Sequence, residues 1–573
     1  RMMKTLHNNV NDTVKESLYG VTYAFPQLEY QVAHKVVLMP KISQLRDRRK
    51  VSLICGGGSG HEPFASGYVG NGMLAAAVAG SIYSAPPSEH VSYAINRVSE
   101  YNNTGVLVIA PNYTGDCLNF GIAIEKAKQK GIKVANINVN EDCSIPEKDQ
   151  SRAGKRGLTG IVFVIKIAGA VAEEGSSLET VYKTAHDVLD NLATTSVGLT
   201  ACAIPGQRRM FELADDEIEV GMGIHGEAGY EKTKLKPSYE IASLMLDRIT
   251  TVLSLKSGDS VAVMINNFGA LSQLEQGIVA HDVVKVLRNM NINPVRIYWG
   301  MIMTSLNSAG VHVTLLKLPD KHKSFFLKCL DAPTDAPKWL GSKFSIPLEP
   351  PEPIIQHEVI RKVDKTGIEL SSDLACDNAI KEEEHLNDLD RGCGDSDAGS
   401  TLKRLAMSTY FLYYTIQFSH PASAFLELAH IAEEEMGGAS GALYCLFFTS
   451  ISTQLISPTD KSWTEIWARA FRTALNSLTQ YGKAMPGDRS LIDPLNALCN
   501  TFDRMVHKPL GEICDALRTS TSQACEATKH MKPMVGRASY VKQAKYLQNV
   551  DAGAYAVVTC VNAVTDVIKT FYS

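Results

Sequence analysis

Two histidines and an aspartate stand in segments where a backbone can approach a small ligand closely. His61 directly follows residues 56–60, Gly-Gly-Gly-Ser-Gly, and His225 is surrounded by four glycines within residues 221–229. An imidazole at such a ligand-lined turn acts as an acid or a base. Asp116 ends the segment Asn-Tyr-Thr-Gly-Asp, where a carboxylate suits hydroxyl recognition or proton abstraction. These residues predict a site for a small polar substrate.

Each of these features also has a plainer interpretation. A glycine-rich segment after a strand is often only a tight turn, and a single histidine is more often a satisfied surface residue. Asp116, taken with its own segment alone, is better explained as a helix N-cap. The surroundings of His225 favour function, because a structural histidine rarely needs four neighbouring glycines.

Three aspartates form a second candidate site. Asp390, Asp395 and Asp397 are interspersed with Gly392 and Gly394. Carboxylate oxygens suit hard cations, whose coordination shells phosphate oxygens complete. The alternative is a solvated acidic loop, which acidic clusters form more often than metal sites.

The bulk composition narrows the class of protein. At 573 residues the chain is long enough for two or three domains, and its net charge of −4 gives no electrostatic reason for a nucleic-acid or acidic-membrane partner. No apolar stretch is long enough to span a bilayer. The 12 cysteines contain no C-x-x-C pair, which indicates reduced, mostly buried thiols. We therefore expect a soluble cytoplasmic protein.

The elements that must position these residues differ between the two halves of the chain. The first half alternates short β-branched runs, at 51–54, 105–110, 133–137 and 260–265, with helical patterns at 119–130, 178–192 and 239–253. The second half carries only helical patterns, at 402–417, 423–436, 463–481, 492–507 and 552–571. Prolines crowd the stretch between them and indicate a semi-extended linker. We predict an α/β domain at 1–335, a linker at 336–371 and an all-helical domain at 372–573.

Several long motifs in this order resemble those of the dihydroxyacetone kinase family, most closely its animal branch, the triokinase/FMN cyclases. The matching segments of the first half are GGGSGHEP at 56–63, NYTGD at 112–116 and GIHGEAG at 223–229. In the second half they are the segment around Asp390, MGGASGA at 436–442, YGKAMPGDRSL at 481–491, GRASY at 536–540 and DAGA at 551–554. The resemblance covers nearly the whole chain and implies a DhaK-like α/β substrate domain followed by a DhaL-like all-α helical barrel for nucleotide.

The resemblance also implies roles for the first site. His225 would hold the carbonyl substrate as a covalent hemiaminal, Asp116 would accept the proton of the attacking hydroxyl, and His61 would assist. The substrate turn corresponds to Gly58, Ser59, Gly60 and His61. The family has a substrate-contacting lysine where this chain has Pro111, so one cation is missing.

For the second site the resemblance implies two Mg²⁺ ions on ATP, held by Asp390, Asp395 and Asp397. Its implied nucleotide contacts are Asp395, Ser396, Asp397, Ala398, Ala439, Ser440, Gly482, Arg489, Ser490, Leu491, Asp551, Ala552 and Gly553. Ser396 replaces a family glycine and Ala552 replaces a family proline.

The expected function is ATP-dependent phosphorylation of dihydroxyacetone and D-glyceraldehyde by a homodimer. The animal branch further implies cleavage of FAD to AMP and riboflavin cyclic 4′,5′-phosphate with Mn²⁺ or Co²⁺. The alternatives are a kinase restricted to dihydroxyacetone without lyase activity, and a catalytically weakened triose-binding or regulatory protein.

Overall fold

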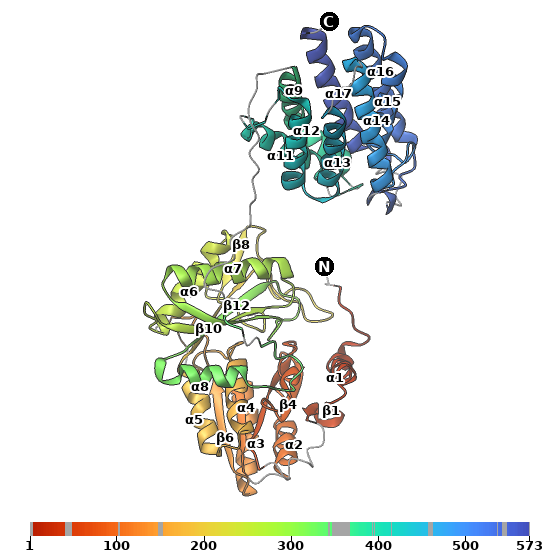
Figure 1. The fold of residues 1–573 in the computed structure, drawn as a ribbon. Coiled ribbons are helices and arrows are strands. Elements are labelled where there is room, and N and C mark those ends of the chain that lie inside the picture. Colours follow the sequence, from red (N-terminus) through yellow and green to blue (C-terminus); the bar gives the residue numbers. More distant parts are fainter. Residues whose placement is uncertain are drawn as a thin grey trace. The chain divides into compact units, whose positions relative to one another are not determined.

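The computed structural model divides into two compact units, Arg1–Glu352 and Pro353–Ser573. It describes residues 4–39, 49–100, 104–146, 150, 153–227, 229–341, 344–346, 367–391, 393–394, 396–413, 415–416, 418–456, 462–535, 537–540 and 547–571. The first unit contains two sheets with helices, whereas the described part of the second unit contains helices alone (Figure 1). Each unit is described separately below.

The first sheet carries the glycine-rich segment on an inner strand. Its strands, in spatial order, are β1 (Glu29–Gln31), β2 (Val36–Leu38), β4 (Ala76–Ile82), β3 (Ser52–Ser59), β5 (Val106–Pro111) and β6 (Val134–Val139). The last four are parallel, and the two short strands join antiparallel at the β4 edge. Both β3 and β5 are buried along their whole length, as expected for parallel strands covered on both faces.

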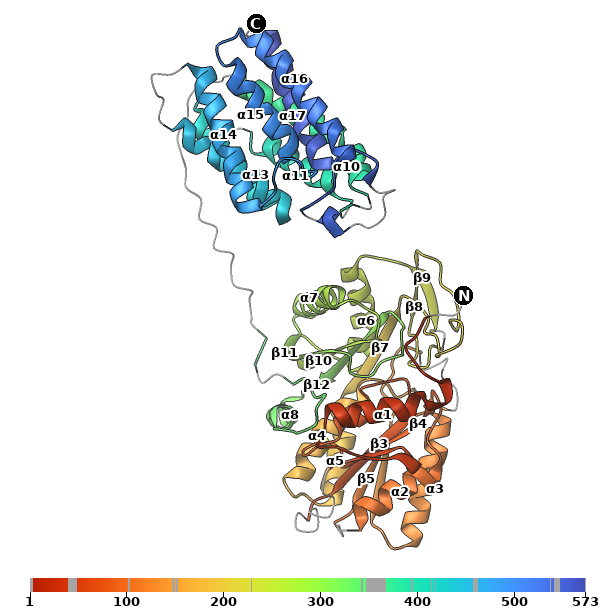
Figure 2. The same ribbon diagram turned by 90° about the vertical axis from the view of Figure 1, so that its right-hand side faces the viewer.

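Helices cover both faces of this sheet. One pair, α2 (Ser88–Ser99) with α3 (Thr114–Gln129), and another pair, α4 (Ile161–Glu173) with α5 (Leu178–Leu189), enclose the strands between them (Figure 2). The remaining helices are α1 (Thr13–Ala24), beside β1, and α8 (Asp320–Asp331), which packs on α4. Every residue of α4 from Ile161 to Ala172 is buried, so the apolar run at this position is a core helix.

The second sheet of this unit is mixed. In spatial order its strands are β11 (Asn293–Gly300), β10 (Ser260–Asn267), β12 (Gly310–Lys317), β7 (Leu192–Gly198), β8 (Glu217–Val220) and β9 (Glu231–Lys234). Only the β10–β11 pair is parallel. The helices α6 (Ser238–Val252) and α7 (Gln273–Asn289) pack against it, and α7 begins with a capping box between Ser272 and Glu275. The segment that contains His225 connects β8 to β9.

The second unit is a closed ring of helices, as the family resemblance implied. The helices are α9 (Gly367–Lys381), α10 (Glu383–Asp390), α11 (Ala398–Phe411), α12 (Pro421–Ile431), α13 (Gly438–Leu455), α14 (Trp463–Gly482), α15 (Ile492–Met505), α16 (Leu510–Ala527) and α17 (Ala552–Phe571). Successive helices from α12 to α17 pack side by side, and α17 packs on α9. In turn α9 contacts α11, and α11 contacts α12. This order of contacts closes the barrel.

The structure corrects several predicted boundaries. The strand predicted at 51–54 continues as β3 to Ser59, because its glycines add no apolar pattern. The helix predicted from residue 119 begins at Thr114, because its polar first turn carries little apolar pattern. The helix predicted at 402–417 is α11, which starts at Ala398 and ends at Phe411. Beyond that end the chain turns so that the hydroxyl of Tyr413 contacts Glu369 of α9. The helix predicted at 423–436 is α12 followed by a π-helical turn, Ala432–Met436.

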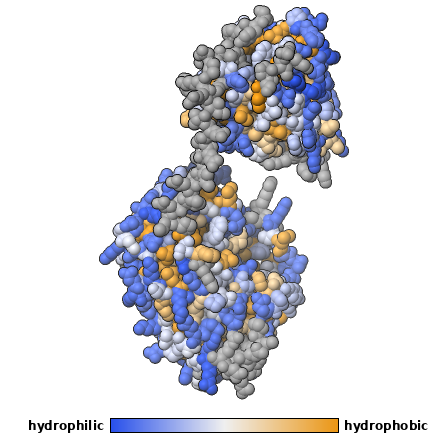
Figure 3. Space-filling model, in the orientation of Figure 1, coloured by the Kyte–Doolittle hydropathy of each residue, from blue (hydrophilic) through white to orange (hydrophobic). Residues whose placement is uncertain are grey.

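Hydrophilic residues cover much of the face of the molecule seen in Figure 3, with hydrophobic residues scattered among them. None of the described helices is both long and apolar enough to cross a bilayer. All 12 cysteines carry free thiols, as predicted.

Candidate active site

Three of the four glycines before His61, Gly56, Gly57 and Gly58, lie in strand β3 and not in the turn that the sequence predicted, whereas Gly60 follows the strand. At Gly56 and Gly58 the neighbouring backbone leaves no room for a side chain. A Cβ on Gly56 would lie 2.2 Å from the carbonyl oxygen of Val78, and one on Gly58 would lie 2.8 Å from the amide nitrogen of Ser84. Gly60 has a φ of +102°, which favours glycine. Main chain therefore forms this wall of the site.

Two of the predicted substrate-turn groups already have partners within the protein. The hydroxyl of Ser59 donates to the carbonyl of Gly80 at 2.8 Å. The amide of Gly60 donates to the carboxylate of Glu62 at 3.0 Å. These bonds fix the shape of the turn, and a substrate that used either group would have to share it.

His61 is buried and is held by its Nδ1, which lies 2.9 Å from the carbonyl oxygen of Thr304. A carbonyl oxygen only accepts, so Nδ1 carries the proton and Nε2 carries the lone pair. That Nε2 has no hydrogen-bond partner among the described residues. Burial and the nearby charge of His225 lower the pKa of His61 to about 3. The ring therefore offers a neutral acceptor at physiological pH.

Asp116 lies in the first turn of α3, beyond the end of β5. It is buried, and its Oδ1 has no hydrogen-bond partner within the described part of the chain. The N-cap residue of α3 is Tyr113, so the interpretation of Asp116 as the N-cap is not what the structure shows. Burial raises the pKa of Asp116 to about 7, although the charge of His225 and a backbone hydrogen bond lower it. A carboxylate with this pKa can exchange a proton near neutral pH.

His225 is surrounded by three aromatic rings that stand edge-on to it. Its ring centroid lies 4.6 Å from that of Tyr113, 4.8 Å from that of His61 and 5.2 Å from that of Tyr83. The interplanar angles are 89°, 81° and 89°. Near-perpendicular ring contacts of this kind hold the imidazole in place. The structure thus brings the predicted residues His61, Asp116 and His225 to one place.

Sequence reasoning missed two aromatic residues of this site. Tyr83 follows β4, has a φ of +57° and stacks on His61 with a centroid distance of 5.1 Å. The hydroxyl of Tyr113 is buried without a partner among the described residues. Tyr113 stands inside the quoted segment at 112–116, so its position was available, but only the fold shows that its ring meets His225. Nothing in the sequence around Tyr83 indicated its position.

Pro111 is the last residue of β5, the strand that pairs with β3. Its Cγ would lie 3.6 Å from a Cβ on Gly57, and the Oδ1 of Asp116 would lie 3.5 Å from the same point. Pro111 therefore contributes to the site, but it contributes no charge there.

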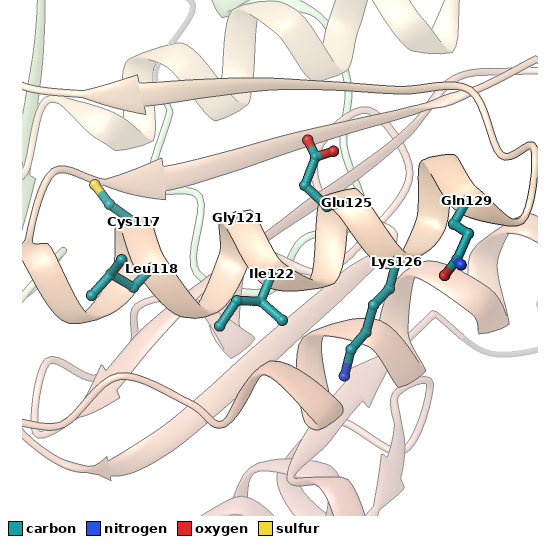
Figure 4. A pocket seen from close by; sticks show the side chains of 7 residues that line it. All are labelled: Cys117, Leu118, Gly121, Ile122, Glu125, Lys126 and Gln129. Carbon is teal, nitrogen blue, oxygen red and sulfur yellow. The ribbon is translucent and has the colours of Figure 1, made fainter.

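A hollow lies on the outer face of α3, but it is not this site. It is lined by Cys117, Leu118, Gly121, Ile122, Glu125, Lys126 and Gln129 (Figure 4). Leu118 is 61% exposed whereas Asp116 is 5% exposed, because residues two apart on a helix point in nearly opposite directions. The hollow and Asp116 thus lie on different faces of α3.

In the second unit, Asp390 and Asp397 meet at the junction of α10 and α11. The amide of Asp397 donates to Oδ2 of Asp390 at 3.2 Å, and a Cβ on Gly394 would lie 2.2 Å from Oδ1 of the same carboxylate. Ser396 has a φ of +61°, so the serine stands in a conformation that favours glycine. Asp395 lies outside the described residues. Among those described, no group of three His, Cys, Asp or Glu side chains is placed to hold a metal ion.

Further carboxylates surround this junction. Asp551 precedes α17, accepts from the amide of Ala554 at 2.9 Å, and is electrostatically coupled to Asp390 and Asp493. Burial raises its pKa to about 6, against the lowering effect of that hydrogen bond and of Arg489. Oxygen donors of this kind fit a hard cation such as Mg²⁺. The structure therefore places the predicted metal ligand Asp390 within electrostatic reach of the predicted nucleotide contact Asp551, and the amide of Asp397 at the carboxylate of Asp390.

The buried side chain of Arg489 connects two backbone segments near Asp551. It is buried with a φ of +59°, and its guanidinium donates to the carbonyls of Thr528 at 3.1 Å and Asn549 at 2.8 Å. The amide of the next residue, Ser490, donates to Asp493 at 2.8 Å. Two of the guanidinium N–H groups are thus used to hold backbone.

The other predicted nucleotide contacts lie at the ends of helices. A Cβ on Gly553 would lie 3.4 Å from the Cβ of Leu491, so these two neighbour one another. Ala398 and Ala552 are the first residues of α11 and α17. Ala439 and Ser440 are exposed in the first turn of α13, and Gly482 ends α14, facing Leu443 of α13.

Comparison with known proteins agrees with this architecture. Residues 19–338 match the Dak1 domain and residues 392–566 match the DAK2 domain. The chain is therefore a two-domain protein in which an α/β Dak1 unit is followed by a helical DAK2 unit. The chain belongs to the dihydroxyacetone kinase family. It is 38% identical to Triokinase/FMN cyclase of Mus musculus over 99% of each chain. It is 34% identical to Dihydroxyacetone kinase 2 of Saccharomyces cerevisiae over 86% of each chain.

A solved structure resembles the whole chain. The dihydroxyacetone kinase from C. freundii in complex with AMP-PNP and Mg²⁺ has a TM-score of 0.63 and 28% identity, covering 98% of this chain and 99% of that one.

Proposed function

We propose that this protein is an ATP-dependent kinase of dihydroxyacetone and D-glyceraldehyde that holds its substrate as a hemiaminal on His225. The observation that carries the proposal is the meeting of His225 with two buried acceptors, Nε2 of His61 and Oδ1 of Asp116, which have no hydrogen-bond partner in the part of the chain that the structure describes. Unpartnered buried polar groups are costly unless a ligand satisfies them. A triose offers both a carbonyl for His225 and hydroxyls for the other two.

The covalent bond supplies selectivity that contacts alone would not. A triose has about six heavy atoms, so non-covalent contacts give only several kcal/mol. A ring nitrogen of His225 adds to the carbonyl carbon, the C=O becomes C–OH, and one ring proton is given up for the one that the oxygen takes. Glycerol lacks the carbonyl and cannot form this bond.

Phosphoryl transfer then needs a base for the substrate hydroxyl. Asp116 accepts the hydroxyl proton as the oxygen attacks the γ-phosphorus, and the lone pair of His61 Nε2 receives a hydrogen bond from the substrate. In the second unit Asp390, Asp395 and Asp397 would hold Mg²⁺, which neutralises charge on the triphosphate. The solved relative, a dihydroxyacetone kinase in complex with AMP-PNP and Mg²⁺, supports the use of ATP with Mg²⁺.

The pH dependence of kcat should report the protonation state of Asp116, the proposed base. Because the pKa of Asp116 is raised to about 7, its carboxyl group is protonated below that pH and cannot accept the proton. We expect kcat to rise as pH increases through about 7, and the rise to disappear in Asp116→Asn, whose kcat should be about 10²- to 10⁴-fold lower. Steady-state kinetics over a pH series measures both. Glu125→Gln, an exposed change on the same helix, should keep the wild-type profile.

A coupled assay of ATP consumption with dihydroxyacetone, D-glyceraldehyde and glycerol tests the kinase proposal. Turnover with both trioses and none with glycerol supports it. Turnover with dihydroxyacetone alone would indicate a kinase restricted to dihydroxyacetone. Triose binding without any ATP consumption would indicate a weakened binding or regulatory protein.

A second activity is favoured by the 38% identity to a relative named Triokinase/FMN cyclase. We propose that the metal–nucleotide site also cleaves FAD to AMP and riboflavin cyclic 4′,5′-phosphate with Mn²⁺ or Co²⁺. Chromatography of FAD incubated with the protein and Mn²⁺ should show both products. Unchanged FAD under these conditions would overturn the proposed lyase activity without affecting the proposed kinase activity.

A further inference from the structure

A row of three charged side chains lies behind His225. Glu227 lies two residues after His225, and its Oε2 accepts a hydrogen bond from the backbone amide of His225 at 2.9 Å. The other carboxylate oxygen, Oε1, lies 3.9 Å from Nδ1 of the His225 ring. The Nη1 of Arg156 lies 3.5 Å from the same Oε1. The Nε of Arg156 donates in turn to Asp142 at 2.6 Å. Arg156 comes from the loop before α4 and Asp142 from the segment after β6.

Glycines make room for this row. A Cβ on Gly223 would lie 2.0 Å from Oε1 of Glu227 and 2.7 Å from Nη1 of Arg156. Gly221, with a φ of +76°, turns its carbonyl to accept from Nη2 of Arg156 at 2.7 Å. Two of the four glycines around His225 are therefore explained by the charged row and not by the substrate.

Each nitrogen of the Arg156 guanidinium has an acceptor within the protein. Its three nitrogens face Asp142, Glu227 and the carbonyl of Gly221, and only 15% of the side chain is exposed. It is therefore not a replacement for the cation that is missing at Pro111. Its acceptors identify it as the support of Glu227.

The carboxylate of Glu227 remains ionised in this setting. Burial alone would raise its pKa, but the hydrogen bond and charge of His225 together with the charge of Arg156 lower it to about 2. Asp142 is anchored as well, because its Oδ1 accepts the amide of Ser144 at 2.8 Å. The row thus presents a fixed negative charge to one side of the His225 ring.

We propose that Glu227, supported by Arg156 and Asp142, is the positioning residue that keeps the proton on Nδ1 of His225 and leaves Nε2 as the nucleophile. A carboxylate beside one ring nitrogen selects the tautomer and orients the ring, and it stabilises the positive charge that develops during attack. As the Nε2–C bond forms and the C=O π bond opens, the substrate oxygen gains a proton and Nδ1 gives one up. This role rests on the proposed hemiaminal.

The test compares wild-type protein, Glu227→Gln and Arg156→Met by ¹³C NMR with dihydroxyacetone labelled at its carbonyl carbon. Hemiaminal formation moves the signal of the bound substrate from the ketone region to that of a saturated carbon. We expect the hemiaminal fraction at subsaturating substrate to fall at least about tenfold in Glu227→Gln and less in Arg156→Met, with a matching rise in KM for dihydroxyacetone. The KM for ATP and the melting temperature should stay unchanged. Glu231→Gln, an exposed change in β9, should behave as wild type.

Each other outcome has a defined meaning. An unchanged hemiaminal fraction in Glu227→Gln would overturn the positioning role while leaving the kinase proposal intact. A variant that also loses thermal stability and ATP affinity would show that Glu227 is structural, which overturns it too. If the wild-type protein forms no hemiaminal, the proposed function itself fails.

Discussion

Replacing His225 by alanine should abolish the hemiaminal and lower kcat/KM for dihydroxyacetone by about a thousandfold or more. The ring is the only group proposed to bond the substrate covalently, and without it a triose is retained by weak contacts alone. Carbonyl-labelled dihydroxyacetone followed by ¹³C NMR measures the first effect, and coupled ATP consumption measures the second.

The matched control is His281→Ala, because that imidazole is 68% exposed on α7 of the same unit. It should retain wild-type kinetics. A His225→Ala protein that still phosphorylates dihydroxyacetone at near wild-type efficiency would contradict the covalent mechanism.

Replacing Asp390 or Asp397 by asparagine should lower kcat by about a thousandfold and leave hemiaminal formation unchanged. The two residues meet at the α10–α11 junction, so each change removes negative charge where a cation would neutralise the triphosphate. Turnover measured against Mg²⁺ concentration, with the NMR experiment on the same samples, separates the two effects.

Asp388→Asn provides the comparison on α10, since Asp388 is exposed and paired with Arg391. We expect it to keep normal turnover. Loss of hemiaminal in Asp390→Asn would argue against a division of labour in which the first unit alone captures the carbonyl.

Much of this architecture could be predicted because the relevant signals are local. Short apolar, β-branched runs predicted strands β5, β6 and β10, of which β5 and β10 are buried throughout and β6 only in part. Helical spacing predicted α14, α15 and α17 with nearly their observed ends. The glycine motifs located His61, Asp116 and His225, but Gly56, Gly57 and Gly58, which were predicted to form a turn, lie in strand β3. Their steric cause, the backbone of β4 and of the following turn, is distant in sequence.

The remaining features depend on contacts that no local pattern encodes. Arg156 and Glu227 are 71 residues apart and meet only because two loops converge. Tyr83 reaches His61 through an unusual backbone conformation after β4. Protonation preferences could not be predicted either, because the pKa of Asp116 depends on burial that the folded chain creates.

The main-chain wall beside His61 has a consequence for redesign toward longer sugars. A pocket bounded by glycine backbone cannot be widened by truncating side chains, because there is none to truncate at Gly56, Gly58 or Gly60. Tyr83 is the nearest removable bulk on that side, lying against Gly60 and bonded through its hydroxyl to Ser305 at 3.2 Å. Engineering of substrate length should therefore begin at the tyrosine and leave the strand untouched.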